Sequence, residues 1–196
     1  MDNSSATKTI STTPSFLARG SGAILDFLFP IHCLGCQIIM PTSSPTPYLC
    51  LGCLEKIKPT SQLQCLFCSS LNPTGKTCPV CRETHALDYL WPAANYDDPF
   101  LKRALWAYKY KFVSSLHSAL SLLLVRFLQS QHKEEFLKTN QENLVIIPVP
   151  LHPRRLRWRS YNQSALLAEE LSRVFQLELI DQVLARPKRR RPQTAI

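Results

Sequence analysis

The sequence predicts an α/β protein in which a zinc-binding segment precedes a domain built on a parallel sheet. Two observations point to this class: all eight cysteines lie between Cys33 and Cys81, and residues 144–173, LVIIPVPLHPRRLRWRSYNQSALLAEELSR, have the order strand, basic loop, helix. A third is size, because 196 residues with 45% hydrophobic content suffice for one domain of ordinary size and a small appendage.

The cysteines form four Cys-x-x-Cys pairs, which are Cys33/Cys36, Cys50/Cys53, Cys65/Cys68 and Cys78/Cys81. Each pair offers two thiolates to a tetrahedral Zn²⁺ at about 2.3 Å, and a second pair completes a closed Cys₄ structural site. The pattern therefore predicts a double zinc ribbon over residues 23–85 that holds two structural Zn²⁺. Pairing in chain order and crossed pairing, first pair with third and second with fourth, both fit the spacing.

Other features of the cysteine region fit zinc better than disulfides. Disulfides require an oxidising compartment, and the sequence carries no signal that would direct it there. Gly35 and Gly52 lie inside two of the pairs, where we expect sharp turns that aim N–H groups at sulfur. His32 and His85 flank the ribbons, but eight sulfurs already satisfy two metals, so we expect neither to be a ligand.

A strand, a basic loop and a helix are predicted for residues 144–175. Leu144–Ile147 is short and apolar, as in a strand buried on both faces of a parallel sheet. Arginines crowd the segment that follows it, at positions Arg154, Arg155, Arg157 and Arg159. Ligands bind at the carboxyl ends of strands in open α/β sheets, so this loop is a candidate anion site.

The helix that follows has a regular apolar face, made of Leu166, Leu167, Leu171, Val174 and Phe175. Asn162 or Ser160 is its expected N-cap. Its amino terminus would present N–H groups to the space that the arginines face, which suits phosphate or pyrophosphate. Residues 177–180 are a candidate second strand, which would complete most of a βαβ unit.

The run from Pro148-Val149-Pro150 to Arg159-Ser160-Tyr161-Asn162-Gln163 resembles the ComF competence-protein family, whose members are similar to type I phosphoribosyltransferases and carry an amino-terminal zinc ribbon. Glycine usually occupies the position of Ser160 in that family. The resemblance covers residues 24–196 and implies a phosphoribosyltransferase-like parallel-sheet domain over residues 86–196. The expected anion- or pyrophosphate-binding residues are Arg154, Arg155, Arg157, Arg159, Asn162, Gln163 and Lys109.

The same resemblance implies phosphoribosyl pyrophosphate as ligand, with Mg²⁺ in a complete family member. Family members have an Asp-Asp-x-x-Thr-Thr-Gly type run that would hold the ribose, Mg²⁺ and 5′-phosphate, and residues 1–196 contain none. Asp97-Asp98 cannot replace it, because Pro99 and a helix follow. The sequence is therefore expected to be an incomplete, inactive phosphoribosyltransferase-like domain, truncated at its carboxyl end.

The distribution of positive charge predicts an anionic partner for the carboxyl-terminal part of the chain. The chain has a net charge of +9, and residues 150–196 hold ten Lys/Arg against four Asp/Glu. The alternatives are a non-catalytic module that binds single-stranded nucleic acid through phosphate contacts and stacking on Trp158 or Tyr161, and an adaptor that docks a protein of the competence machinery. A solvated basic face without a ligand is the simplest alternative.

The amino-terminal residues 1–22 are rich in Ser and Thr and are expected to be disordered. Residues 23–31 form a short apolar run interrupted by Asp26 and Pro30, too short for a membrane span. We expect a helical turn there whose Leu25, Phe27, Leu28 and Phe29 pack against the following domain. The sequence thus indicates a cytoplasmic protein.

The central segment is predicted to be a strand followed by two helices. Residues 86–96 resemble a strand, and Asp98 and Pro99 are typical of a helix start. The core-facing residues of this first helix are expected to be Leu101, Leu105, Tyr108 and Phe112. Residues 113–130 predict a second, strongly apolar helix that covers the sheet, and residues 131–143 a polar link.

Overall fold

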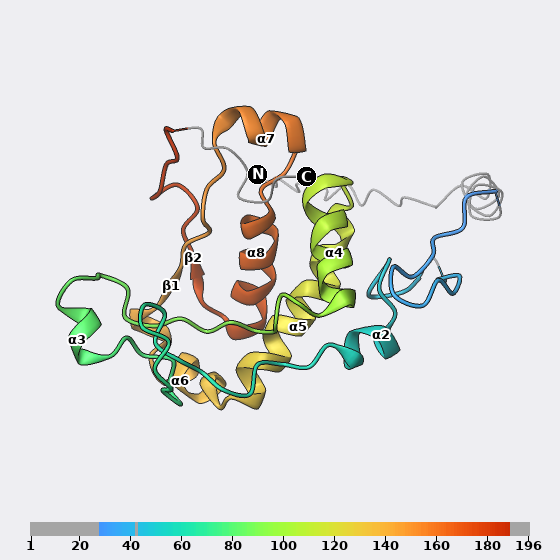
Figure 1. The fold of residues 1–196 in the computed structure, drawn as a ribbon. Helices are drawn as coiled ribbons and strands as arrows, with labels where there is room; N and C mark the ends of the chain where they lie inside the picture. The colour runs from blue at the N-terminus through green and yellow to red at the C-terminus, as the bar shows by residue number, and fades with distance from the viewer. Residues whose placement is uncertain (1–27, 42, 189–196) are drawn as a thin grey trace, which may run out of the picture.

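The structure, a computed structural model, describes residues 28–41 and 43–188. Its helices are α2 (Leu51–Lys56), α3 (Pro79–Arg82), α4 (Pro99–Tyr110), α5 (His117–Ser130), α6 (Lys133–Thr139), α7 (Pro153–Arg159) and α8 (Gln163–Phe175), with 3-10 turns η1 (Ser114–Leu116) and η2 (Gln141–Asn143) and strands β1 (Val145–Ile146) and β2 (Glu178–Leu179). Helices α4, α5 and α8 form the body, and the cysteine-bearing segments near α2 and α3 lie on opposite flanks (Figure 1).

Helix α4 begins where the sequence predicts. The Asp98 carboxylate accepts hydrogen bonds from the backbone N–H groups of Phe100 and Leu101, each at 2.9 Å, and Pro99 occupies the first turn. The helix buries Leu101 and Tyr108 as expected. The prediction that Phe112 joins the core is wrong: it follows the end of the helix, has φ of +60° and is 47% exposed.

Helices α5 and α8 pack against each other in the centre of the molecule. The predicted helix over 113–130 is confirmed as η1 followed by α5, and Leu120 and Phe127 are buried. The link over 131–143 contains α6 and η2, which the sequence analysis missed. In α8, Phe175 is buried as predicted, but Val174 is 48% exposed.

The sheet is a parallel pair in which Val145 faces Glu178 and Ile146 faces Leu179. This pairing, connected through α8, confirms the predicted βαβ unit, although both strands are only two residues long. The prediction of burial on both faces is wrong, because Val145 and Ile147 are 44% and 36% exposed. Only one face of β1 is covered, by contacts of Leu144 and Ile146 with a hydrophobic core.

The predicted basic loop is a helix, α7, and this corrects the sequence analysis. The His152 imidazole Nδ1 accepts from the backbone N–H of Arg154 at 3.1 Å, and Pro153 stands in the first turn, where a missing N–H costs nothing. The helix ends at Ser160, which has φ of +66°. The arginines therefore point in different directions around a helix.

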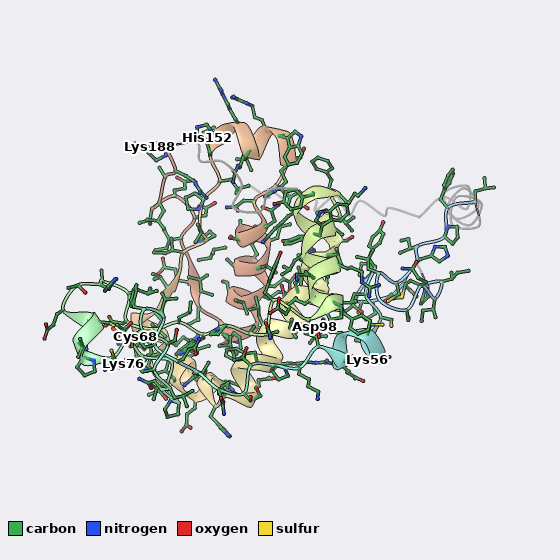
Figure 2. All side chains as sticks on the ribbon, in the orientation of Figure 1. Lys56, Cys68, Lys76, Asp98, His152 and Lys188 are labelled. Atoms are coloured by element: carbon green, nitrogen blue, oxygen red, sulfur yellow. The ribbon has the colours of Figure 1, made fainter. Side chains whose placement is uncertain are left out.

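Two hydrophobic cores hold these elements together. The first joins the first cysteine-bearing segment to α4 and α5, and its buried members include Cys33, Leu49, Cys53, Leu54, Leu101, Tyr108 and Leu120. The second is formed by Leu63, Phe127, Leu128, Phe175 and Leu177, with Trp91 against it. Each flank is thus anchored to the helical body by apolar packing. Figure 2 shows Lys56 on one flank and Cys68 and Lys76 on the other.

The remaining predictions concern the segments that join these cores. Residues 86–96 do not form a regular strand; they make single antiparallel bridges, Lys76 with Tyr89 and Pro59 with Ala94. Leu28 and Phe29 are 60% and 75% exposed, so their predicted packing is wrong. Residues 1–27, with the rest of the predicted apolar turn, lie outside the described residues.

Candidate metal centres and basic helix

The cysteine sulfurs gather into two groups of four. Cys33, Cys36, Cys50 and Cys53 form the first cluster, and Cys65, Cys68, Cys78 and Cys81 form the second. Within each cluster all four sulfurs lie within 4.8 Å of one another. The pairs therefore combine in chain order, and the crossed arrangement that the spacing allowed is wrong.

The distances between sulfurs fit zinc. A tetrahedral ion with Zn–S bonds of about 2.3 Å places its sulfurs about 3.8 Å apart. The Cys36 and Cys50 sulfurs are 3.7 Å apart in the first cluster, and the Cys68 and Cys78 sulfurs are 3.7 Å apart in the second. None of the eight cysteines forms a disulfide. Two Cys₄ groups of this geometry are compatible with two zinc ions.

The first Cys-x-x-Cys pair of each cluster is followed by the same backbone conformation. Gln37 and Ser69, which directly follow Cys36 and Cys68, have φ of +64° and +59°. Their N–H groups bond the carbonyls of Cys33 and Cys65 at 3.0 and 2.9 Å. The sharp turns therefore occur just outside the Cys-x-x-Cys pairs, and neither Gly35 nor Gly52 has a positive φ.

The glycine positions have unequal roles. A Cβ on Gly35 would lie 2.6 Å from the Cys53 sulfur and 2.8 Å from Cδ1 of Phe100, so only glycine fits there. A Cβ on Gly52 would have no neighbour within 4 Å. Gly35 is thus required for close packing over the first cluster, whereas Gly52 is an ordinary position in α2.

Backbone N–H groups stabilise the thiolate form of one cysteine in each cluster, and the thiolate is the form that binds metal. Burial raises the pKa of Cys33, but hydrogen bonds from the N–H groups of Cys50, Cys36 and Gly35 outweigh it and hold the pKa at about 6. Hydrogen bonds from the backbone N–H groups of Cys68, Cys78 and Phe67 lower the pKa of Cys65 to about 6.

Neither His32 nor His85 belongs to a cluster. His85 stacks on Phe67 with ring centroids 3.6 Å apart, and its Nδ1 lies 3.0 Å from the Cys81 carbonyl. His32 makes a single antiparallel bridge with Ile39. Both residues are therefore part of the structure around the clusters.

The arginines of α7 occupy three different environments. Arg154 and Arg157 are exposed, Arg155 is half-buried, and Arg159 is buried at 9% exposure. The Arg159 Nη1 donates to the Gln163 amide oxygen at 2.8 Å, and its guanidinium lies 5.7 Å from the ring centres of both Tyr110 and Trp158. Only Arg154 and Arg157 are thus fully available on the surface.

Asn162 and Gln163 make contacts inside the protein. Asn162 caps α8, since its Oδ1 accepts from the Ser164 N–H at 3.2 Å, and its Nδ2 donates to the Val149 carbonyl at 3.2 Å. Gln163 is buried, and its carbonyl accepts from the Tyr108 hydroxyl at 2.9 Å. These bonds fix the junction of α7 and α8 against α4 and the segment that follows β1. Lys109 is exposed near the end of α4.

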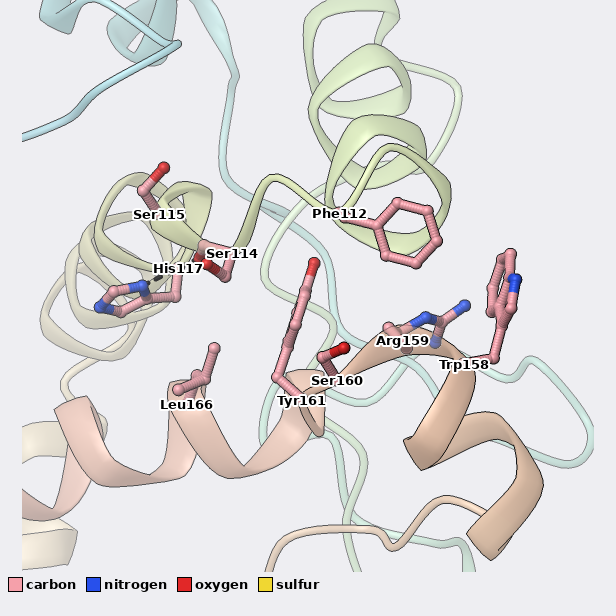
Figure 3. Close-up of a pocket in the computed structure, with 9 residues that line it drawn as sticks. All are labelled: Phe112, Ser114, Ser115, His117, Trp158, Arg159, Ser160, Tyr161 and Leu166. Carbon is pink, nitrogen blue, oxygen red and sulfur yellow. Dashed lines mark hydrogen bonds between the residues drawn. The ribbon is translucent and has the colours of Figure 1, made fainter.

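A cavity of about 630 Å³ lies beside this junction, and no sequence pattern predicts it. Figure 3 shows its residues coming from the turn after α4, the start of α5, the end of α7 and the start of α8. Phe112, Ser114, Ser115 and His117 form part of its lining. No sequence pattern marked them, and Phe112 had been assigned to the core because of its helical spacing.

These features define an α/β protein with two Cys₄ clusters suited to zinc, a small parallel sheet and a basic helix at the end of its first strand. Among the residues the structure describes, no helix is long and apolar enough to cross a membrane.

Comparison with known proteins connects this architecture to competence proteins. The chain is 29% identical over 160 residues to Competence protein F of Haemophilus influenzae, an alignment that covers 81% of the chain and 65% of that protein. The similarity and the two cysteine clusters confirm the resemblance to the ComF family. No protein-family model matches the chain, and no solved structure matches it.

Proposed function

We propose that the chain is a zinc-stabilised, competence-related protein that binds polyanions through α7. The observation that carries this proposal is the placement of Arg154 and Arg157 on the surface of a helix that follows the carboxyl end of β1. Guanidinium groups bind phosphate oxygens through paired N–H donors. The two cysteine clusters have a structural role on the flanks of the same body.

The similarity to Competence protein F supports a role linked to DNA uptake, with phosphoribosyl pyrophosphate or single-stranded DNA as the polyanion. Reduced thiolates suited to zinc fit a cytoplasmic location, where cysteines remain reduced. A protein of the competence machinery is a further proposed partner. The alignment spans 65% of the length of that relative.

Catalysis requires more of residues 1–196 than binding of the ligand does. Transfer of a phosphoribosyl group requires positioning of the ligand and neutralisation of its charge on several sides. The arginines of α7 supply one such side, and residues 1–196 contain no Asp-Asp-x-x-Thr-Thr-Gly run. We propose that this polypeptide by itself binds the ligand without turnover, which an assay of pyrophosphate release in the presence of Mg²⁺ tests.

Single-stranded DNA is favoured as a second ligand by the position of Trp158. Its ring is 56% exposed on the same helix as Arg154 and Arg157. Proteins that bind single strands combine cationic groups for the backbone with aromatic rings for the bases. The basic helix offers both kinds of group on one element.

The test is binding to a labelled oligothymidylate and to phosphoribosyl pyrophosphate with Mg²⁺. Replacement of Arg154 and Arg157 by Ala should weaken the binding of either ligand. For DNA, the slope of log affinity against log salt should fall by about 1.4, which is about 0.7 for each of two lost phosphate contacts. Both side chains are exposed, so the double variant should remain folded.

The matched control removes the same charge elsewhere, with Lys58 and Arg126 replaced by Ala. Lys58 is exposed, and Arg126 lies 4.0 Å from Glu55 on the side of α5. This control should retain the affinity and most of the salt slope. Equal losses in both double variants would mean that binding responds only to net charge and that α7 is a solvated basic face.

A further inference from the structure

The cavity beside the α7–α8 junction has the size and position of a ligand site. Its volume of about 630 Å³ lies within the range of 300–1,000 Å³ that is usual for small-molecule pockets. Figure 3 shows Phe112, Trp158 and Arg159 on one side and Ser114, Ser115 and His117 on the other, with Tyr161 between them. Four separate segments thus converge on one space.

Arg159 places a buried positive charge at the wall of this cavity. The residue is 9% exposed, and its Nε has no hydrogen-bond partner among the described residues. Within the described part of the chain, no carboxylate forms an ion pair with it; Tyr110, Tyr161 and Arg155 are the ionisable groups close enough to affect its pKa. Burial lowers the pKa of Arg159, but arginine remains protonated in proteins.

An unpaired buried charge is costly, and an anion in the cavity would compensate it. The side chain is already held in place, because Nη1 donates to Gln163 and the guanidinium lies over the rings of Tyr110 and Trp158. An anion would therefore meet a pre-positioned partner. This property distinguishes Arg159 from the exposed Arg154 and Arg157, which are solvated.

Two aromatic rings lie next to this charge. The ring centres of Phe112 and Trp158 are 5.0 Å apart with an interplanar angle of 66°, and the residues are 47% and 56% exposed. Large aromatic rings left this open on a surface provide faces on which a planar group can stack. The cavity therefore offers a stacking surface beside a cation.

The backbone around the rings is strained. Phe112 and Ser160 both line the cavity, and both have positive φ, +60° and +66°. A bulky side chain rarely adopts this conformation, and such strain concentrates at functional sites. At Phe112 the strain places an exposed ring at the edge of the cavity instead of in the core.

The far wall carries hydrogen-bonding groups. Ser114 and Ser115 line this wall, and Figure 3 shows the Ser115 hydroxyl directed away from Tyr161 and Arg159. His117 is positioned by its own contacts, since Nδ1 lies 3.0 Å from the Ser114 carbonyl and Nε2 lies 3.7 Å from a Glu170 carboxylate oxygen. Because both ring nitrogens of His117 face groups of the protein itself, the Ser114 hydroxyl is the group of this wall that suits the hydroxyl of a sugar or the polar edge of a base.

We propose that this cavity binds one nucleotide, with the base stacked on Trp158 and bordered by Phe112, and with the phosphate directed to Arg159. The inference rests on the proposed binding of polyanions by α7 and specifies the chemical class of the bound unit. The nucleotide can be a free nucleoside monophosphate or one residue of a single strand, since both present the same base and phosphate.

Calorimetric titration of zinc-loaded protein with dTMP, thymidine, inorganic phosphate and a twelve-residue oligothymidylate tests the proposal. At least one of dTMP and the oligonucleotide should bind, and thymidine or phosphate alone should bind at least tenfold more weakly than the combined unit. Binding of dTMP identifies a free nucleotide as ligand, and binding of the oligonucleotide alone identifies a strand.

Two variants locate the binding. Trp158→Leu removes an exposed ring and should weaken binding by about tenfold or more, as expected when a stacked base loses its platform. Phe112→Gly removes the second ring at a position where glycine relieves strain, so it should weaken binding while leaving the melting temperature unchanged or higher. Trp106→Leu, which removes a 45% exposed ring on α4, is the matched control and should retain affinity.

The results separate this inference from the proposed function. Loss of oligonucleotide binding in the Arg154 and Arg157 double variant, with dTMP binding retained, supports both. Binding that depends on Trp158 but not on Arg154 and Arg157 supports the cavity and refutes the role of the α7 surface. Absence of binding by both dTMP and the oligonucleotide, or equal affinity in the Trp158, Phe112 and Trp106 variants, overturns the nucleotide site.

Discussion

Replacement of Gly35 by Ala should destroy the first cysteine cluster, whereas the same change at Gly52 should not. Both glycines lie inside Cys-x-x-Cys pairs of one cluster, so the sequence pattern treats them alike. The structure separates them, because the new Cβ at position 35 would lie 2.6 Å from the Cys53 sulfur, and the new Cβ at position 52 would meet nothing within 4 Å.

The expected magnitude follows from these contacts. Ordinary contacts of a Cβ begin at 3.4 Å, so the Cys53 sulfur would have to move by about 0.8 Å, and zinc sites tolerate deviations of only about 0.2 Å. Cys53 is 2% exposed and cannot move outward without disturbing the first core. Overpacking of this kind costs about 1–3 kcal/mol before any loss of metal. In contrast, Gly52→Ala should stabilise α2 by up to about 1 kcal/mol.

Metal analysis and thermal unfolding of the two variants and the parent provide the assay. Gly35→Ala should retain about one zinc per chain and melt at a lower temperature, while Gly52→Ala should retain about two zinc ions and melt at the same or a higher temperature. Two zinc ions and an unchanged melting temperature in Gly35→Ala would refute the close packing over the cluster.

Three further predictions concern the helical body. Ser160→Gly should raise the free energy of unfolding by about 1 kcal/mol, because φ is +66° there; denaturant unfolding measures this, and a loss of stability would contradict it. Asp98→Ala should lower stability by about 1 kcal/mol through loss of the α4 cap, whereas an unchanged unfolding midpoint would argue against capping. Burial raises the pKa of Tyr108, whose hydroxyl donates to the Gln163 carbonyl. The folded state therefore favours the neutral hydroxyl, and the contribution of Tyr108 to the free energy of unfolding should be complete below about pH 10 and decline as the pH rises further. Tyr108→Phe should reduce this alkaline decline in unfolding measurements, and an identical decline would refute the assignment.

The parts of the fold that local chemistry determines could be predicted from the sequence. The start of α4 followed from Asp98 and Pro99, and the four Cys-x-x-Cys pairs identified the metal ligands. The parallel pairing of β1 with β2 followed from an apolar run, a helix and a second apolar run. For the start of α4 and for each Cys-x-x-Cys pair, residues close in sequence supply the deciding interaction.

Properties that depend on distant parts of the chain were not predictable. The spacing allowed two ways of combining the cysteine pairs, and chain order follows from contacts between successive pairs, such as the Cys50 N–H with the Cys33 sulfur at 3.3 Å and the Cys78 N–H with the Cys65 sulfur at 3.5 Å. The arginine-rich segment follows the end of a predicted strand, which favoured a loop, but Pro153 suits the first turn of a helix that His152 caps. Phe112 fitted the apolar stripe of α4, yet the helix ends before it and its ring turns to the cavity.

The most direct test of the two-cluster organisation is the zinc content of two double variants. Cys33→Ser/Cys50→Ser alters two ligands of the first cluster, so it should lose about one zinc per chain and retain the other. Cys33→Ser/Cys65→Ser alters one ligand in each cluster and should lose both ions. The reverse result, with both ions lost in the first variant and only one in the second, would contradict pairing in chain order and with it the separate cluster on each flank of the body.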